Sequence, residues 1–200
     1  MSAGLAPLVA QRKSGSERFR YQNRDVGIDL LSFWQWSVSD LVSNATRGRL
    51  AEYIVAQALG LAHDVRNEWD AYDLRTSTGL KVEVKSAAYI QSWFQRKPSP
   101  IVFRVPRTRA WDAATNILST EVKRQADVYV FALLSHPHKN TVDPLNLDQW
   151  QFYVLGVSTL NERQRSQYSI TLKSLQALCR APVGFGGLAK AILSFEDSHC

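Results

Sequence analysis

The sequence has few of the residues on which disulfide frameworks and sulfur-based metal clusters depend. Its 200 residues include two cysteines, four histidines and one methionine. The two cysteines, Cys179 and Cys200, are too few for a disulfide framework or a cysteine-based zinc site. We therefore expect a protein of the reducing cytoplasm.

Long apolar segments are also missing. No hydrophobic run approaches the roughly 20 residues that a bilayer-spanning helix needs, so no membrane association is expected. The short apolar stretch at residues 5–10 is followed by basic residues, whereas a secretory signal carries its basic residues in front. These features exclude a membrane-spanning protein and do not favour an exported one.

The remaining composition is that of a globular protein. Hydrophobic residues make up 45% of the chain and charged residues 21%, and the length suits one domain of ordinary size. Residues 1–26 are rich in Ser, Arg, Gln and Gly, so we expect a loose basic arm there. Residues 27–200 should then form a single domain with its core at about residues 44–180.

Positive charge is concentrated in one part of the chain. The formal net charge is +6, and residues 85–124 hold eight basic residues against two acidic ones, an excess of six. Aromatic residues are interleaved with these cations, a mixture that suits phosphates and stacked bases. A solvated basic face is the alternative. The candidate nucleic-acid contacts are Ser86, Gln91, Trp93, Arg96, Lys97, Arg104, Arg107 and Arg109.

The hydrophobic pattern changes from helical to strand periodicity near residue 60. Ser39 or Ser43 can cap a helix that continues to Leu59, where Gly60 ends it. Residues 68–75 and 80–86 then indicate two strands joined by a turn at residues 76–79.

Two continuous apolar runs follow, at residues 127–134 and 152–157, and both are typical of buried strands. Further helices are expected to start near Ser158 and over residues 174–180, and the glycine-rich residues 184–187 indicate a flexible loop before a final segment. The pattern predicts an α/β protein with a mixed central sheet flanked by helices.

The turn between the first two strands decides which side chains meet. If its loop is Ser77-Thr78-Gly79, with Gly79 in the left-handed backbone region, then Thr76 pairs with Leu80. Counting back along both strands places Asp73 directly opposite Glu83, on one face of the pair. A two-residue loop would shift the pairing by one and separate these two carboxylates.

This register gathers a group of charged side chains that suits phosphodiester hydrolysis. Lys85 falls on the same strand face as Glu83, because strand side chains alternate. Two carboxylates at this separation repel each other unless a cation lies between them, and Mg²⁺ is held by one or two carboxylates plus waters and phosphate oxygens. Lys85 is then placed to position or deprotonate the attacking water.

Glu52 adds a third carboxylate from the preceding helix. It lies at the edge of the apolar stripe of that helix, where a carboxylate is costly unless it is paired or bound to a metal. If the helix packs on the hairpin, Glu52 can point at Asp73 and Glu83. An exposed helix carboxylate is the alternative.

In order and residue type, Glu52, Asp73 and Glu83-Val84-Lys85 resemble the conserved motif of the PD-(D/E)XK nucleases. That superfamily has a helix bearing a Glu, a hairpin bearing an Asp and a Glu-x-Lys triplet, then two further strands and a helix. The resemblance covers residues 44–135 and extends loosely to about 180. Tyr72 stands where the family has its Pro, and Asp70 is an alternative first carboxylate.

The resemblance implies a restriction-endonuclease-like core and a Mg²⁺-dependent DNA endonuclease, in which Mn²⁺ also substitutes for Mg²⁺. Asp73, Glu83 and the Val84 carbonyl would be metal ligands, Lys85 the catalytic lysine, and Glu52 an orienting residue. Residues 91–111 would hold the DNA. Cleavage of both duplex strands, in restriction, mobile-element defence or repair, would favour a homodimer.

Two other functions fit parts of the same pattern. A Glu-x-Lys triplet alone is common on surface strands. The chain could therefore be a non-catalytic nucleic-acid-binding module that retains the nuclease fold, or a protein–protein adaptor with a charged surface hairpin. The sequence leaves the recognition sequence, the cut position and the choice between DNA and RNA open.

Overall fold

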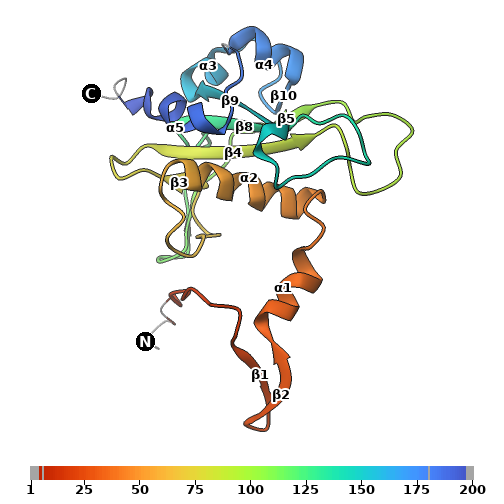
Figure 1. Ribbon diagram of the computed structural model, residues 1–200. Coiled ribbons are helices and arrows are strands. Elements are labelled where there is room, and N and C mark those ends of the chain that lie inside the picture. The colour runs from red at the N-terminus through yellow and green to blue at the C-terminus, as the bar shows by residue number, and fades with distance from the viewer. Residues whose placement is uncertain (1–4, 6, 180, 197–200) are drawn as a thin grey trace.

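A mixed four-stranded sheet forms the centre of the protein, as seen in a computed structural model that describes residues 5, 7–179 and 181–196 (Figure 1). Strand β4 runs parallel to β8, whereas β3 and β9 pair antiparallel with their neighbours. The α/β class expected from the sequence is confirmed. The sheet order is β3 (Leu74–Arg75), β4 (Lys81–Ala88), β8 (Val128–Leu134) and β9 (Trp150–Gly156).

Both faces of the sheet are covered, which explains the two continuous apolar runs in the sequence. Every residue of β8 is buried, because it lies between β4 and β9 and carries layers on both sides. On one face α2 (Asn44–Ala58) and α5 (Phe185–Leu193) pack against Val82, Val84 and Phe152. The opposite face carries α3 (Val157–Glu162), α4 (Leu172–Leu178) and the pair of β5 (Val102–Arg104) with β10 (Ser169–Thr171).

The long helix α2 begins and ends at the residues that the sequence favours. The Ser43 side chain accepts a hydrogen bond from the Thr46 backbone N–H, so Ser43 is the N-cap. Gly60 follows the C-cap Leu59 and has a φ of 69°, a conformation in which glycine has no Cβ clash. The helix packs Ala51 and Val55 against β4 and carries Glu52 to the edge of the sheet.

The β3–β4 turn has the register that was predicted from its loop. Leu74 pairs with Val82 and Arg75 with Lys81, and the Thr76 N–H donates to the Leu80 carbonyl at 3.0 Å. Gly79 has a φ of 95°, so it supplies the left-handed position of a three-residue loop. The register continues toward Asp73 and Glu83.

Two sequence predictions differ from the structure. Residues 68–73 form bends and not a strand, so β3 is limited to Leu74–Arg75. This segment leaves the sheet and contacts α2 and the hairpin of β6 (Trp111–Asp112) and β7 (Ile117–Leu118). The glycine-rich residues 184–187 are not a flexible loop either. Gly184 is the N-cap of α5, and the helix includes the two glycines that follow Phe185.

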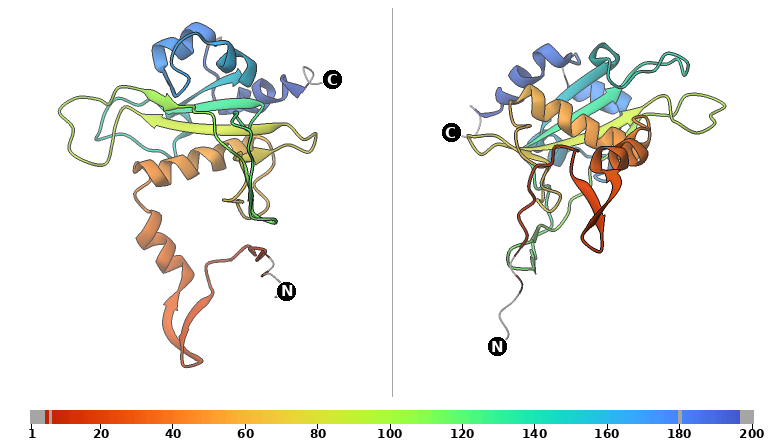
Figure 2. Two further views of the ribbon diagram at one scale, coloured as in Figure 1. Left: turned by 180° about the vertical axis from the view of Figure 1, so that it is seen from behind. Right: turned by 60° about the horizontal axis from the view of Figure 1, so that its bottom comes forward.

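Residues 18–38 are folded and stand away from the sheet, whereas a loose arm was expected over residues 1–26 (Figures 1 and 2). Residues 1–4 and 6 of that expected arm lie outside the described residues. Strands β1 (Arg18–Tyr21) and β2 (Arg24–Asp29) form an antiparallel hairpin that leads into α1 (Leu30–Val38). The Asp29 side chain caps this helix by accepting from the Ser32 N–H. We call residues 18–38 the arm.

The remaining elements are short. Strands β6 (Trp111–Asp112) and β7 (Ile117–Leu118) form a second small hairpin, and the 3-10 helix η1 (Leu147–Gln149) precedes β9. Within the described parts of the chain, no helix combines the length and the apolar character needed to cross a bilayer.

Two glycine substitutions test the turn. Gly79→Ala should lower the free energy of unfolding by about 1–2 kcal/mol, because a side chain is disfavoured at its positive φ. Gly48→Ala is the matched control: Gly48 lies inside α2 with nothing within 4 Å of an added Cβ, so it should raise that free energy by about 0.5–1 kcal/mol. Urea unfolding measures both. An unchanged Gly79→Ala variant would contradict the account of the turn.

Candidate active site

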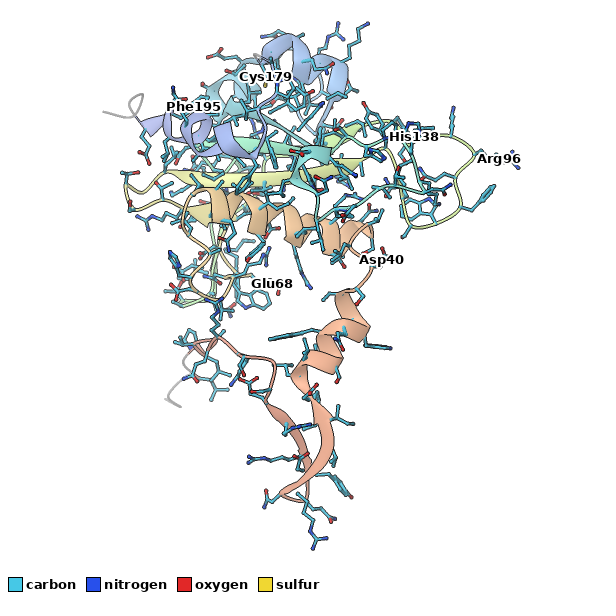
Figure 3. All side chains as sticks on the ribbon, in the orientation of Figure 1. Asp40, Glu68, Arg96, His138, Cys179 and Phe195 are labelled. Carbon is cyan, nitrogen blue, oxygen red and sulfur yellow. The ribbon has the colours of Figure 1, made fainter. Side chains whose placement is uncertain are left out.

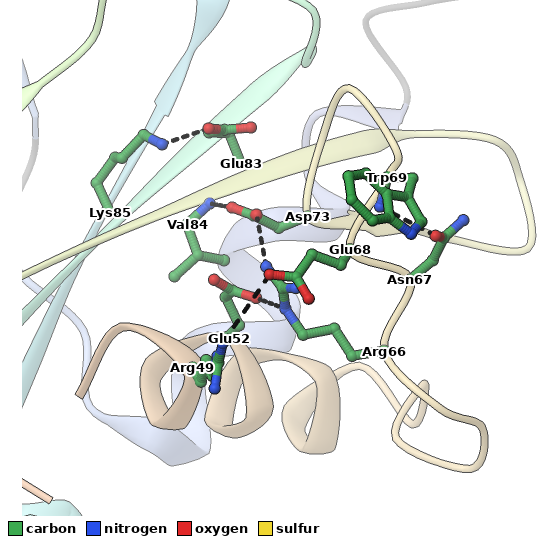
Figure 4. Close-up of polar contacts among 10 residues, drawn as sticks. All are labelled: Arg49, Glu52, Arg66, Asn67, Glu68, Trp69, Asp73, Glu83, Val84 and Lys85. Atoms are coloured by element: carbon green, nitrogen blue, oxygen red, sulfur yellow. Dashed lines mark hydrogen bonds and ion pairs between the residues drawn. The ribbon is translucent and has the colours of Figure 1, made fainter. Parts of the chain in front are cut away.

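Asp73 lies beside β4, immediately before the short edge strand β3. Strand β3 pairs only with Lys81 and Val82, and beyond them Asp73 Oδ2 accepts a hydrogen bond from the Val84 N–H at 2.7 Å (Figure 4). The N–H and C=O of one strand residue point to the same side. The Val84 carbonyl therefore faces the edge that Asp73 occupies.

Glu83 and Lys85 form an ion pair on one side of β4 (Figure 4). Their side chains are only 17% and 31% exposed, since they lie against the layer formed around Tyr129 and Val105. A cavity of about 60 Å³ adjoins both of them, with Tyr129 and Ala71 also in its wall. One water molecule needs roughly 10–15 Å³, so there is room here for a small hydrated group.

Glu52 and Arg66 lie on the other side of β4 (Figure 4). The Arg66 guanidinium hydrogen-bonds to Glu52 and reaches Asp73 Oδ1 at 3.9 Å, so it links the two carboxylates. The Glu52 side chain is 15% exposed, which makes an exposed helix carboxylate the wrong interpretation. Arg66 could not be predicted as a site residue from the sequence, because it lies in an irregular segment with no periodicity.

The pKa of Asp73 is raised to about 7. Burial is the main cause, and the neighbouring carboxylates of Glu83 and Glu52 add to it. The Val84 N–H and the Lys85 ammonium act in the opposite direction. A cation brought to this edge would relieve the crowding of negative charge, which is the electrostatic condition for a metal site.

The donors present fit a Mg²⁺ ion that keeps several waters. In residues 5, 7–179 and 181–196 no three or more His, Cys, Asp or Glu side chains lie close enough together to hold a metal. The available set is two carboxylates, Asp73 and Glu83, and the Val84 carbonyl. Mg²⁺ is commonly bound through one or two carboxylates, whereas zinc needs three or four protein ligands.

Two of the predicted nucleic-acid contacts are used inside the protein. Arg47, at the start of α2, is buried and donates to Ser86 Oγ and Gln91 Oε1, each at 3.2 Å. Gln91 is itself buried, so the structure does not present its side chain to DNA. Ser86 and Gln91 instead help Arg47 to hold α2 against the end of β4.

The other predicted contacts fall into two groups. Arg107 and Arg109 are exposed and alternate with Pro106 and Thr108, which line the small cavity beside Glu83. Arg104 is exposed on β5, just before them. Trp93, Arg96 and Lys97 lie on a loop beyond the far end of β4, and Figure 3 shows Arg96 projecting from the body there. Only the first group adjoins the carboxylates.

The alternative carboxylate, Asp70, does not join the cluster. It is exposed, and it lines a larger cavity between residues 64–71, the β6–β7 hairpin and the N-terminal segment. Asp73 is therefore the better first carboxylate.

A mixed α/β fold that gathers carboxylates and a lysine at a sheet edge suits a nuclease, and a comparison with protein families agrees. A family model described as bacteriophage T4 endonuclease IV matches residues 2–173. The protein belongs to this endonuclease family, since the match spans most of the chain. A search of curated proteins found no significant match. The family description names no metal and no fold superfamily.

The raised pKa of Asp73 predicts how pH acts on the metal-free protein. The folded state binds the Asp73 proton more tightly than the unfolded chain, so this contribution to stability is complete below the ordinary value of 3.8 and is lost as pH rises through about 7. Asp73→Asn keeps an acceptor for Val84 but has no charge. Its free energy of unfolding relative to the wild type should therefore increase from pH 5 to pH 8.

Urea unfolding in the presence of a chelator measures this difference. Asp70→Asn is the matched variant, because it removes an exposed carboxylate from the neighbouring segment. A difference between Asp73→Asn and the wild type that is the same at pH 5 and at pH 8 would refute the raised pKa of Asp73.

Proposed function

We propose that this endonuclease is a Mg²⁺-dependent enzyme of the PD-(D/E)XK type that hydrolyses phosphodiester bonds in DNA. One observation carries the proposal: the β3–β4 register brings Asp73, Glu83 and the Val84 backbone to one edge, with Lys85 paired to Glu83. The order of Glu52, Asp73 and Glu83-Val84-Lys85 along the chain supports the same assignment. Membership of an endonuclease family supplies independent support for the reaction.

Asp73, Glu83 and the Val84 carbonyl would hold the metal. When bound, Mg²⁺ supplies positive charge that activates the attacking water and offsets the charge developing on the phosphate. Mn²⁺ should substitute, since it prefers similar oxygen ligands. The raised pKa of Asp73 means that metal binding competes with a proton at this carboxylate.

Lys85 is placed to handle the water and the developing charge. Its ammonium is paired with Glu83, and both side chains line the small cavity together with Pro106 and Thr108. In this position Lys85 can orient an attacking water by hydrogen bonding and stabilise the negative phosphate oxygens.

The Arg66 guanidinium places positive charge between two carboxylates of the site. It neutralises Glu52 and Asp73, two carboxylates that would otherwise repel each other. If a cation were held at Asp73, the contact between Arg66 and Asp73 would no longer be needed to offset the charge of this carboxylate. The guanidinium can then turn to a phosphate oxygen of the substrate, for which its planar set of donors is well suited. Glu52 would orient the site.

The DNA would lie along the edge that carries Arg104, Arg107 and Arg109, because these exposed cations lead to the cavity beside Glu83. Trp93, Arg96 and Lys97 would contact more distant nucleotides. The biological role would be restriction, defence against mobile elements or repair. The rival is a non-catalytic module that binds DNA through the same cations.

The two functions differ in what three substitutions do. Asp73→Ala and Glu83→Ala should abolish Mg²⁺-dependent cleavage, because each removes a ligand, and Lys85→Ala should slow it by on the order of 10²–10³-fold. Cleavage is measured on supercoiled plasmid, single-stranded DNA and RNA, with Mg²⁺ or with a chelator. Retention on DNA at low salt should be the same for all variants.

Asp70→Ala is the matched control, since it removes an exposed carboxylate three residues from Asp73, and it should cut at the wild-type rate. If all three site variants cut as fast as the wild type, the proposed site is wrong. If the wild type binds DNA but never cuts it, the non-catalytic module is the correct function.

A further inference from the structure

The arm exposes more apolar surface than is usual for a monomeric protein. Helix α1 has apolar residues on all sides, yet none of its nine residues is buried. Helices of this composition are normally enclosed. Seven large side chains of the arm are between 44% and 84% exposed: Phe19, Tyr21, Val26, Ile28, Leu31, Phe33 and Trp36.

The arm is nevertheless a preformed unit. The Leu31 N–H donates to the Gly15 carbonyl at 2.8 Å and the Leu30 N–H to the Glu17 carbonyl at 2.9 Å. Gly15 is buried against Trp34, where an added Cβ would lie 3.1 Å from the indole ring. These contacts fix the helix relative to its hairpin, so the apolar side chains are presented in a defined arrangement.

The exposed area is that of a protein interface. An aromatic side chain offers about 200 Å², so the four aromatic residues among the seven expose roughly 500 Å², to which the three aliphatic residues add. A standard protein–protein interface buries about 800 Å² on each partner. The arm is nearly neutral, with three arginines and two aspartates over residues 18–38, which does not favour a phosphate backbone.

The same chain carries a hollow that complements the arm. A cavity of about 1020 Å³ lies between residues 64–71, the β6–β7 hairpin and the N-terminal segment. Its apolar lining includes Val65, Trp69, Trp111 and Ile117, and Trp69 packs edge-on against Trp111 at 5.7 Å between ring centroids. All four side chains are at least 38% exposed, so this surface is also without a cover.

The charges of the cavity and of the arm also favour their association. Three exposed aspartates line the cavity, Asp64, Asp70 and Asp112, against Arg12 and Arg66, of which Arg66 is already paired with Glu52. The hairpin of the arm carries three exposed arginines, and Arg18 is already paired with Asp25 and Asp29. Arg20 and Arg24 are therefore the cations that the aspartates of the cavity would meet. An apolar helix next to cations would thus meet an apolar hollow next to carboxylates.

We propose that the protein is a homodimer in which the arm of each copy seats in this cavity of the other. One chain carries both the projection and the complementary hollow, which is the property that a two-fold interface requires, and reciprocal exchange closes the assembly at two copies. The proposal does not depend on the metal or on cleavage.

The first test is the mass in solution, by light scattering on a sizing column at about 50 µM chain. The wild type should have about twice the mass of the 22.6 kDa chain. Phe33→Glu/Trp36→Glu should have the mass of one chain, with an unchanged circular dichroism spectrum. Tyr168→Glu is the matched control: Tyr168 is 74% exposed on the body, and this variant should stay dimeric. A monomeric wild type, or a dimeric arm variant, overturns the proposal.

The second test locates the contact and excludes closure within one chain. In a Cys179→Ser/Cys200→Ser background, Ser37→Cys is made in one preparation and Ala113→Cys in another. Mixing and mild oxidation should give a disulfide-linked dimer in excess of either preparation alone. Dimers without such a product would place the arm elsewhere and refute the exchange. If the wild type is a monomer and Phe33→Glu/Trp36→Glu no longer binds DNA, the proposal is overturned and the arm is a DNA-binding surface.

Discussion

The three-residue turn between β3 and β4 is the constraint on which the rest of the site depends. Gly79 takes a backbone conformation that other residues avoid, and this fixes Thr76 opposite Leu80. The register between β3 and β4 follows from that contact. Because side chains alternate along a strand, a slip of one residue would turn Glu83 and Lys85 to the other face. The parallel pairing of β4 with the fully buried β8 then holds the strand in place.

The fixed register forces negative charges together, and the protein compensates for them in two ways. Lys85 pairs with Glu83 on one side of β4, and Arg66 links Glu52 with Asp73 on the other. Asp73 still has a raised pKa, because it is buried and because Glu83 and Glu52 lie close to it. A divalent cation at this edge would offset the repulsion between the carboxylates. In this way the fold, the local electrostatics and the proposed hydrolysis of DNA follow from one pairing.

The sequence predicted those parts that short-range rules decide. The period of the apolar residues indicated α2 and the buried strand β8, and Gly79 indicated the turn that brings Asp73 near Glu83. What it did not predict depends on contacts between distant segments. Arg66 reaches Glu52 from an irregular loop, and the buried Arg47 takes up Ser86 and Gln91, which looked like contacts for DNA. Residues 1–26 resembled a loose tail because they are rich in polar residues, whereas residues 18–26 belong to the β1–β2 hairpin, and Trp34 of α1 packs against Gly15.

The central claim is that Asp73, Glu83 and the Val84 carbonyl form a metal site at the edge of β4. The most direct measurement is anomalous diffraction from crystals grown with Mn²⁺. The account predicts an anomalous peak within ligand distance of both carboxylates and of the Val84 carbonyl, with the Arg66 guanidinium moved away from Asp73. The metal site would be contradicted if crystals at saturating Mn²⁺ show no anomalous peak at this edge and Arg66 still lies between Glu52 and Asp73.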